Sequence, residues 1–402
     1  MSSSRPSKDR KAPGAAALGT VYFTVFLDLL GFGIILPWLP FYAAELKATG
    51  FDLGLLFTSY SLAQLFGAAV LGHLSDRYGR RPMLLLSLVG SATGMVLSGL
   101  ATTLVALCAA RAVAGLFGGS IAVAQAYVAD VTRPEDRARS MGMVGASIGL
   151  GFVVGPALGA AFIAAGHGFH SVAFFSAGLA VLNLILAGWW LQEPDQHGGD
   201  GLAQRRFASS SWRRAFGRAE LTRTLMATLL TMAAFVGMET TFAYLGRDRF
   251  GLDELGFGLV LAYVGVVLVL VQGGLIGRLT RKLGVRPVAQ LGCLLLGASL
   301  VALPLVPSFA LTLVALGVLA AGQGLTSPSL STLISRLANA DEQGSVLGVG
   351  QSLSALARAF APMLAGRLYD EAHAAPYVLG GLLAVAAAVL LAGLEDPAVE
   401  DS

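Results

Sequence analysis

Charged residues are scarce in this chain. Only 13% of its 402 residues are Asp, Glu, Lys or Arg, while 55% are hydrophobic, and a soluble domain carries about a quarter charged residues. The deficit falls in long apolar runs, which can cross a bilayer as helices because a helix satisfies its own backbone groups. The composition therefore excludes a soluble enzyme and predicts an all-α, polytopic membrane protein.

Cysteine is also nearly absent. Cys108 and Cys293 both lie inside apolar runs, where a small buried hydrophobe is the expected role, so we assign neither a disulfide nor a metal to them. The sequence shows no metal-ligand cluster, nucleophile elbow or phosphate loop. These absences leave an enzymatic function unsupported, and we expect no cofactor.

Twelve segments fit as membrane spans. They cover residues 17–42, 53–74, 83–101, 103–127, 141–166, 169–191, 222–246, 256–277, 287–306, 309–334, 345–367 and 375–394. If both termini are cytoplasmic, the inner segments hold 21 of the 27 Lys and Arg residues and the outer loops hold four. The positive-inside rule therefore predicts twelve spans with both termini in the cytoplasm. Short loops and Ala/Gly/Leu-rich helices suit a bacterial inner membrane.

A long loop divides the chain into two halves. Residues 1–192 are expected to form one six-helix bundle, residues 193–221 a cytoplasmic linker, and residues 222–402 a second six-helix bundle. The end of the linker, "SWRRAFGRAEL", mixes aromatic residues with three arginines. Such a segment is either a solvated basic linker or a helix lying on the anionic inner leaflet, and we favour the helix.

The two halves share a repeat. "GHLSDRYGRRP" (72–82) and "GRLTRKLGVRP" (277–287) have identical residues at five of eleven positions. Each segment follows the second span of its half. A constant offset indicates parallel repeats, which are typical of transporters that rock about a site between their halves.

The first copy of this repeat closely resembles the loop signature of the major facilitator superfamily. The resemblance covers essentially the whole chain and implies a major facilitator fold of two six-helix bundles around a central cavity. It implies that Gly72 packs the second span against the eleventh, and that a charge network helps to hold the outward-facing state. The residues implied in this conformational switch are Gly72, Asp76, Arg77, Gly79, Arg80, Arg81 and Asp130. The second copy has Arg281 in place of Asp76, so the switch role is carried to the first copy alone.

The fifth span contains a ladder of small residues. Gly151, Gly155 and Gly159 recur every four residues, beside Pro156, and this spacing lets helices approach to backbone contact. The string resembles a signature of the proton-coupled antiporter branch, specifically the twelve-span drug:H⁺ antiporters and their tetracycline-efflux group. It departs from that signature in ending on Ala160. Acids that the tetracycline group carries in spans 3 and 9 are missing here, so we expect the proton route or the stoichiometry to differ and do not assign tetracycline as the substrate.

Four charges are predicted within spans: Asp28, Arg111, Glu239 and Arg358. Each costs about 2.5–3.5 kcal/mol at mid-membrane on insertion scales, which argues for a function. Their charges sum to zero, so two static ion pairs are one interpretation. The other is proton coupling, because a low-dielectric setting favours the neutral form of a carboxyl group while arginine stays charged.

Polar stripes on otherwise apolar spans predict the wall of a substrate cavity. We assign to it Tyr60, Gln64, Gln125, Gln323, Ser327, Gln351 and Ser354. The sequence thus predicts a proton-driven exporter of small, largely hydrophobic compounds that works by alternating access. Its expected partners are this small-molecule substrate, protons and the lipid bilayer, without nucleic acid, and we expect a monomer.

Two other functions stay open. An uptake symporter for a sugar or an organic acid would keep the fold and reverse the direction of transport, and the glycine ladder argues against it. A transport-inactive sensor or scaffold would be expected to carry large extra domains or tails, and the tails here are about 16 and 8 residues long.

Overall fold

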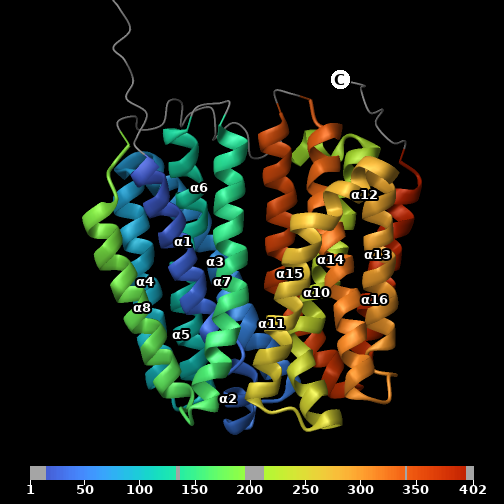
Figure 1. Cartoon of the computed structure of the whole chain (residues 1–402), viewed down its shortest axis with the longest axis horizontal. Coiled ribbons are helices and arrows are strands. Elements are labelled where there is room, and N and C mark those ends of the chain that lie inside the picture. Colours follow the sequence, from blue (N-terminus) through green and yellow to red (C-terminus); the bar gives the residue numbers. More distant parts are fainter. Residues whose placement is uncertain (1–14, 133–135, 195–211, 340–341, 395–402) are drawn as a thin grey trace, which may run out of the picture.

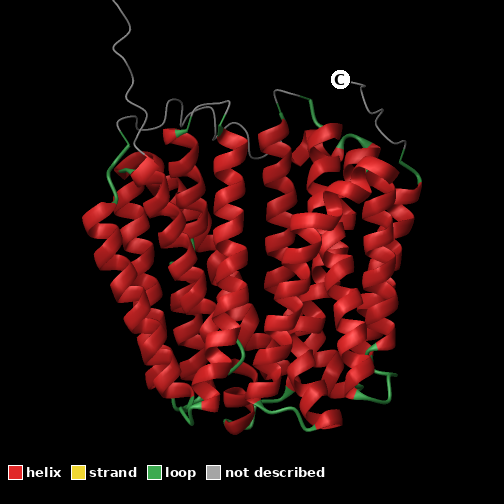
Figure 2. Ribbon diagram, viewed as in Figure 1, coloured by secondary structure: helices red, strands yellow, loops and turns green. Residues whose placement is uncertain are grey.

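A computed structural model describes residues 15–132, 136–194, 212–339 and 342–394. Every regular element in these ranges is a helix, and none is a strand (Figure 2). The helices stand side by side in two groups (Figure 1). This arrangement confirms the all-helical membrane fold that the apolar runs predict.

The first half of the chain forms one group of helices. These are α1 (Ala15–Ile35), α2 (Leu39–Glu45), α3 (Gly50–Tyr78), α4 (Arg80–Leu100), α5 (Leu104–Leu116), α6 (Ser120–Val131), α7 (Arg137–Ala164) and α8 (Phe169–Trp190). The second half forms the other group. These are α10 (Ala219–Phe250), α11 (Glu254–Leu270), the π-helix η1 (Val271–Leu275), α12 (Ile276–Leu283), α13 (Val285–Ala302), α14 (Phe309–Leu337), α15 (Gln343–Glu371) and α16 (Ala375–Ala392).

Eleven helical segments in the described part of the chain are long and apolar enough to cross a membrane. The remaining predicted span corresponds to α15, which has 29 residues but carries Arg358 and other polar groups along its length. Helix α15 nevertheless packs against α3, α10 and α14, as the other membrane-length helices pack against their neighbours. Large apolar side chains such as Trp189 and Leu270 are 77% and 67% exposed, as expected of a surface that faces lipid.

Three of the predicted continuous spans are interrupted. The first breaks between α1 and α2 at 36–38, because Pro37 has no backbone N–H to continue the helix. The fourth breaks at 117–119, where "FGG" separates α5 from α6. The eighth passes through the π-helix η1, which contains Gly273 and Gly274. Apolar length alone does not reveal these breaks.

The two groups of helices meet tightly at one end. Asp370 of α15 accepts hydrogen bonds from the backbone N–H groups of Gly50 and Phe51 at 2.7 and 2.8 Å, so it caps the start of α3 across the interface. A Cβ atom on Gly54 would lie 2.7 Å from the Cα of Met363, so backbone meets backbone there. We call this end, which also carries α2, the closed end.

The other end carries Asp76, Arg80 and Asp130, and we call it the charge-network end. Helices α1 and α6 extend toward it in the first group, and α14 and α16 end there in the second (Figure 1). Cβ atoms added to Gly72 on α3, or to Gly344 and Gly348 on α15, would meet no atom within 4 Å. At these three glycines, therefore, α3 and α15 are not packed as closely as they are at the closed end.

The segment before α10 packs on the second group of helices. Residues 212–216 form a short helical turn in which the rings of Trp212 and Phe216 stack at 5.7 Å. Ala215 is fully buried against residues of α10, α14 and α15. Residues 195–211 of the predicted linker lie outside the described part of the chain, and a helix on the membrane surface stays a prediction.

Candidate functional site

Asp28 lies on α1, inside the first group of helices. Ser91 of α4 donates a hydrogen bond to Oδ1 at 3.1 Å, and Ser120, the first residue of α6, donates one to Oδ2 at 2.5 Å. Among the ion pairs of the described residues, none involves Asp28. A hydroxyl group can donate to a carboxylate or accept from a protonated carboxyl group. This setting therefore suits both protonation states of Asp28.

Arg111 on α5 is 1% exposed and is held mainly by aromatic rings. Its guanidinium carbon lies 4.5 Å from the ring centre of Tyr60 and 5.2 Å from that of Phe32. Its buried Nη1 has no hydrogen-bond partner among the described residues. A buried, unsatisfied cationic donor is costly, so Arg111 is suited to bind an acceptor that arrives from elsewhere.

The break in the fourth span supports this region. The side-chain amide of Gln64 donates to the carbonyl oxygen of Gly118 at 3.0 Å and to the Tyr60 hydroxyl at 3.3 Å. Ser87 donates to the carbonyl oxygen of Phe117 at 2.5 Å. Side chains thus satisfy backbone carbonyls that the interrupted helix leaves without a partner. The break also places Ser120 at the start of α6, where it reaches Asp28.

In the second group, Glu239 on α10 and Arg358 on α15 are close enough to interact electrostatically. They do not form an ion pair within 4 Å, and neither do Asp28 and Arg111, among the described residues. The nearest hydrogen-bond partner of Arg358 is the sulfur of Met232, at 3.9 Å. The interpretation of the four charges as two static ion pairs is therefore wrong for this conformation, whereas proton coupling stays a prediction.

A cavity of about 210 Å³ lies among α10, α14 and α15, and we call it the central cavity. Five of the predicted residues line it: Gln323, Ser327, Gln351, Ser354 and Arg358. The Oε1 atom of Gln323 is buried there without a hydrogen-bond partner in the described structure. The other predicted lining residues lie apart. Tyr60 contacts Arg111, and Gln64 donates to the Tyr60 hydroxyl, while Gln125 is exposed on α6.

Tyr60 lies near charged residues of both groups of helices. The charges of Arg111, Asp28 and Arg358 all act on its hydroxyl group. Arg358 in turn interacts with Glu239. Of the three charged residues near Tyr60, Arg111 has a close contact with its ring, with the guanidinium carbon 4.5 Å from the ring centre.

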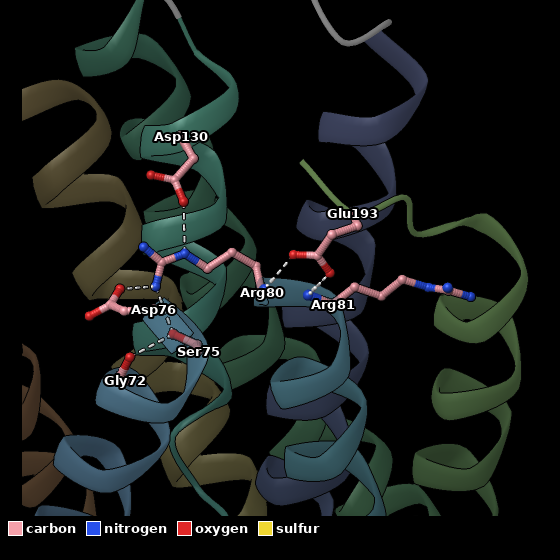
Figure 3. A network of polar contacts seen from close by, with 7 residues as sticks. All are labelled: Gly72, Ser75, Asp76, Arg80, Arg81, Asp130 and Glu193. Atoms are coloured by element: carbon pink, nitrogen blue, oxygen red, sulfur yellow. Dashed lines mark hydrogen bonds and ion pairs between the residues drawn. The ribbon is translucent and has the colours of Figure 1, made fainter. Parts of the chain in front are cut away.

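A second polar site holds the charge-network end of the first group together (Figure 3). The Arg80 guanidinium donates to Asp130 at 2.7 Å, pairs with Asp76 at 2.6 Å and donates to the Ser75 hydroxyl at 2.7 Å. Only 11% of the Arg80 side chain is exposed. The structure thus brings Asp76, Arg80 and Asp130 together as the family resemblance implies.

Glu193 completes this network, and the sequence patterns did not predict it. Its carboxylate accepts hydrogen bonds from the backbone N–H groups of Arg80 and Arg81 at 2.7 and 2.9 Å (Figure 3). It therefore caps the start of α4, where a negative charge is favourable. Gly79 adopts φ +104°, and a Cβ there would lie 2.7 Å from Glu193 Oε1. The signal in the sequence was an acid two residues after the predicted sixth span.

Two residues of the predicted switch are placed differently from what the resemblance implies. Arg77 lies over the ring of its neighbour Tyr78, 5.2 Å from the ring centre. Gly72, expected to pack the second span against the eleventh, has open space where a side chain would stand, since a Cβ there would meet no atom within 4 Å. That expectation is wrong for this conformation, because α3 and α15 approach each other at the closed end. Gly72 instead accepts a hydrogen bond from Ser75 at its carbonyl oxygen.

The glycine ladder of α7 packs against α1. Cβ atoms added to Gly151 and Gly155 would lie 2.7 Å from the Cβ of Leu29 and from the Cα of Gly33, respectively. A Cβ atom added to Gly159 would lie close to the carbonyl oxygen of Ile34. A Cβ on Gly33 would in turn lie 3.3 Å from the ring of Pro156, inside α7. The ladder therefore holds the helix that carries Asp28.

Comparisons with known proteins agree with this architecture. The family model of the Major Facilitator Superfamily matches residues 21–362 and 275–401. The chain is 33% identical to the class C tetracycline resistance protein of Escherichia coli, with 88% of this chain and 89% of that protein aligned. It is 28% identical to multidrug resistance protein 2 of Bacillus subtilis (strain 168), with 90% of each aligned.

Solved structures show the same fold. The human organic anion transporter MFSD10 (TETRAN) superposes with a TM-score of 0.69 at 24% identity, covering 94% of this chain and 99% of that one. A bacterial homologue of the lysosomal transporter Spinster, in an inward-facing and unoccupied conformation, superposes with a TM-score of 0.72 at 15% identity, covering 96% of each chain. With membrane-length helices in two groups and a family match along its length, this chain belongs to the major facilitator superfamily and is a multi-pass membrane transporter.

Proposed function

We propose that the protein is a proton-coupled antiporter that exports small, largely hydrophobic compounds across a bacterial inner membrane. The observation that carries this proposal is the setting of Asp28, whose carboxylate is held by two hydroxyl groups and by no cation among the described residues. Such a carboxyl group can gain and lose a proton without breaking an ion pair. The similarity to tetracycline and multidrug resistance proteins supports the direction and the class of substrate.

In this proposal the protein works by alternating access, with the two ends of the molecule opening in turn. With both termini cytoplasmic, the charge-network end faces the cytoplasm and the closed end faces outward, so the conformation is inward-facing. The contacts of Arg80 with Asp76 and Asp130 are formed in this conformation, so they are not confined to the outward-facing state that they are expected to help hold. Protons enter from outside to Asp28 and Glu239, and substrate binding near Arg111 and Arg358 competes with protonation. One proton that moves down 100 mV supplies about 2.3 kcal/mol, which corresponds to roughly fiftyfold accumulation.

The test uses purified protein in proteoliposomes under an imposed pH gradient. A panel of tetracycline, a lipophilic cation and a lipophilic anion is added while proton flux is followed with an internal pH dye. At least one compound is expected to drive proton efflux opposite to its own movement in wild type. Asp28→Asn is expected to abolish the coupled flux, and Glu239→Gln to reduce or abolish it.

Asp253→Asn is the matched control, because Asp253 caps α11 at an exposed site and asparagine is an equally good N-cap. Normal coupling in both acid variants would contradict the role of these carboxyl groups. Proton flux in the same direction as the compound would favour the uptake symporter instead. An absence of any response in wild type would contradict drug export.

A further inference from the structure

A second cavity, of about 430 Å³, lies among α12, α13 and α14. We call it the arginine cavity, because Arg281 of α12 and Arg336 of α14 both line it. Helix α12 lies at the charge-network end of the second group (Figure 1). The arginine cavity and the central cavity both border α14 but share no lining residue. None of the residues assigned to transport above lines this cavity.

The internal repeat relates Arg281 to Asp76. Helix α3 ends at Tyr78 and α12 ends at Leu283, and each is followed by a glycine of positive φ, +104° in the first half and +88° in the second. Asp76 and Arg281 each lie two residues before the end of their helix. They therefore hold equivalent places with opposite charges.

The same comparison relates Arg336 to Asp130. Helix α6 ends at Val131 and α14 ends at Leu337, and the next helices, α7 and α15, begin at Arg137 and Gln343. Asp130 and Arg336 are each the last residue but one of their helix. Both acids of the first charge network are thus replaced by arginines in the second half.

The centre of the network differs as well. In the first half, the Arg80 guanidinium lies between Asp76 and Asp130. The equivalent residue, directly after the glycine, is Val285, which is 5% exposed and apolar. The place between the two arginines is therefore open cavity. Neither arginine has an ion pair or a hydrogen bond to the described part of the chain.

A buried hydroxyl also lines this cavity. Ser329 of α14 is 1% exposed, and its Oγ has no hydrogen-bond partner in the described structure. Two guanidinium groups and a free hydroxyl donor suit an oxyanion, which would satisfy the donors and offset the repulsion between the cations. The charge pattern is thus inverted relative to the first half, and its two exposed arginines suit an anion at the centre.

The bilayer is the source of anion that the surroundings favour. Leu275 and Leu283, at the two ends of the α12 region, are 42% and 51% exposed and apolar, so lipid chains can lie beside the cavity. Gly277 lines the cavity and leaves its helix surface open. Basic pockets between transmembrane helices are known to bind anionic headgroups. We propose that the arginine cavity binds the phosphate of an anionic phospholipid headgroup.

Lipid retention by the purified full-length protein tests this proposal. The protein is delipidated in detergent, titrated with phosphatidylglycerol or phosphatidylcholine, and studied by native mass spectrometry. We expect wild type to retain one phosphatidylglycerol in preference to phosphatidylcholine. The double variant Arg281→Gln/Arg336→Gln is expected to bind it about thirtyfold more weakly, because two cationic contacts to the headgroup are lost.

Arg278→Gln is the matched control, since Arg278 lies on the same helix, is exposed and does not line the cavity. It is expected to retain the lipid as wild type does. Ser329→Ala removes the free hydroxyl without a change of charge and is expected to weaken binding about fivefold. It provides an independent test if the double variant does not fold.

A parallel titration with inorganic phosphate separates the two sources of anion. Phosphate should neither displace the lipid nor stabilise the delipidated protein against heat at concentrations where phosphatidylglycerol does. Equal lipid retention by wild type and the cavity variants would overturn the proposal. Occupation of the cavity by inorganic phosphate in preference to lipid would overturn it also.

Discussion

Gly79 shows how one residue sets the start of a helix in this protein. Its φ of +104° turns the chain between α3 and α4, and its missing side chain leaves room for the carboxylate of Glu193. Glu193 then accepts the N–H groups of Arg80 and Arg81, and α4 begins. The turn between α3 and α4, the space for the Glu193 carboxylate and the capping of α4 therefore all depend on Gly79.

Gly79→Ala is expected to lower the free energy of unfolding by about 1–3 kcal/mol, because alanine is strained at this φ and its Cβ would strike Glu193. Thermal unfolding of the purified protein in detergent measures the effect. Gly178→Ala on α8 is the control: it meets no atom within 4 Å and lies inside a helix. That variant should be stabilised by about 0.5–1 kcal/mol. Equal melting temperatures for the two variants would contradict the account.

At the scale of single helices, the glycine ladder of α7 fixes the position of α1 and hence of Asp28. Gly155→Ala places a Cβ 2.7 Å from the Cα of Gly33, so the two backbones must separate. Overpacking of this kind costs about 1–3 kcal/mol. We expect a lower melting temperature together with impaired coupled transport, since Asp28 moves relative to Ser91 and Ser120.

Gly149→Ala, on the same helix, is the control for this prediction. The added Cβ would have no atom within 4 Å, so the substitution is expected to leave transport unchanged and to stabilise the helix slightly. The comparison is made by thermal unfolding and by transport in proteoliposomes. If Gly149→Ala proved as harmful as Gly155→Ala, contact between α1 and α7 would not be the reason.

Apolar length and the Lys/Arg distribution predict the helical rods well, because the bilayer imposes one requirement on every span. The breaks after Ile35 and Leu116 were not predicted, since they depend on how side chains satisfy particular carbonyls, as Gln64 does for Gly118. Polar stripes predicted the central cavity around Gln323 and Arg358. The polar stripes could not predict the position of Gln125. Helical spacing shows which residues share a helix face, but it does not show what that face packs against.

Glu193 and Gly72 show a further limit, which concerns the conformation of the molecule. In the proposed transport cycle, a motif can mark residues that meet in another state, and Gly72 has no close neighbour in the present one. Glu193 acts through backbone N–H groups of another helix, so no side-chain pairing in the sequence points to it. The sequence motif thus predicted the side-chain ion pairs of Arg80 with Asp76 and Asp130, but not the backbone capping by Glu193.

At the scale of the whole molecule, Asp370 helps to hold the closed end together by capping α3 from the other group. Asp370→Asn weakens two hydrogen bonds to a charged acceptor at an exposed site, at a cost of about 1 kcal/mol. This change is expected to shift the population of the two conformations roughly fivefold away from the closed arrangement. Distances between spin labels on α3 and α15 at that end report the shift.

Glu371→Gln is the control for this measurement. Glu371 forms an ion pair with Arg367 on the same helix, and both side chains are more than half exposed. Such a surface pair contributes little, so the distance distribution should match that of wild type. An unchanged distribution for Asp370→Asn would show that packing around Gly54 and Gly366 holds the closed end without it.

The central claim is that substrate and proton compete at Asp28. Its most direct test is proton release by the purified protein in weakly buffered detergent solution, on addition of a compound that binds. Wild type is expected to release protons on binding, and Asp28→Asn to bind the compound while releasing fewer protons. Undiminished release by Asp28→Asn would contradict the claim.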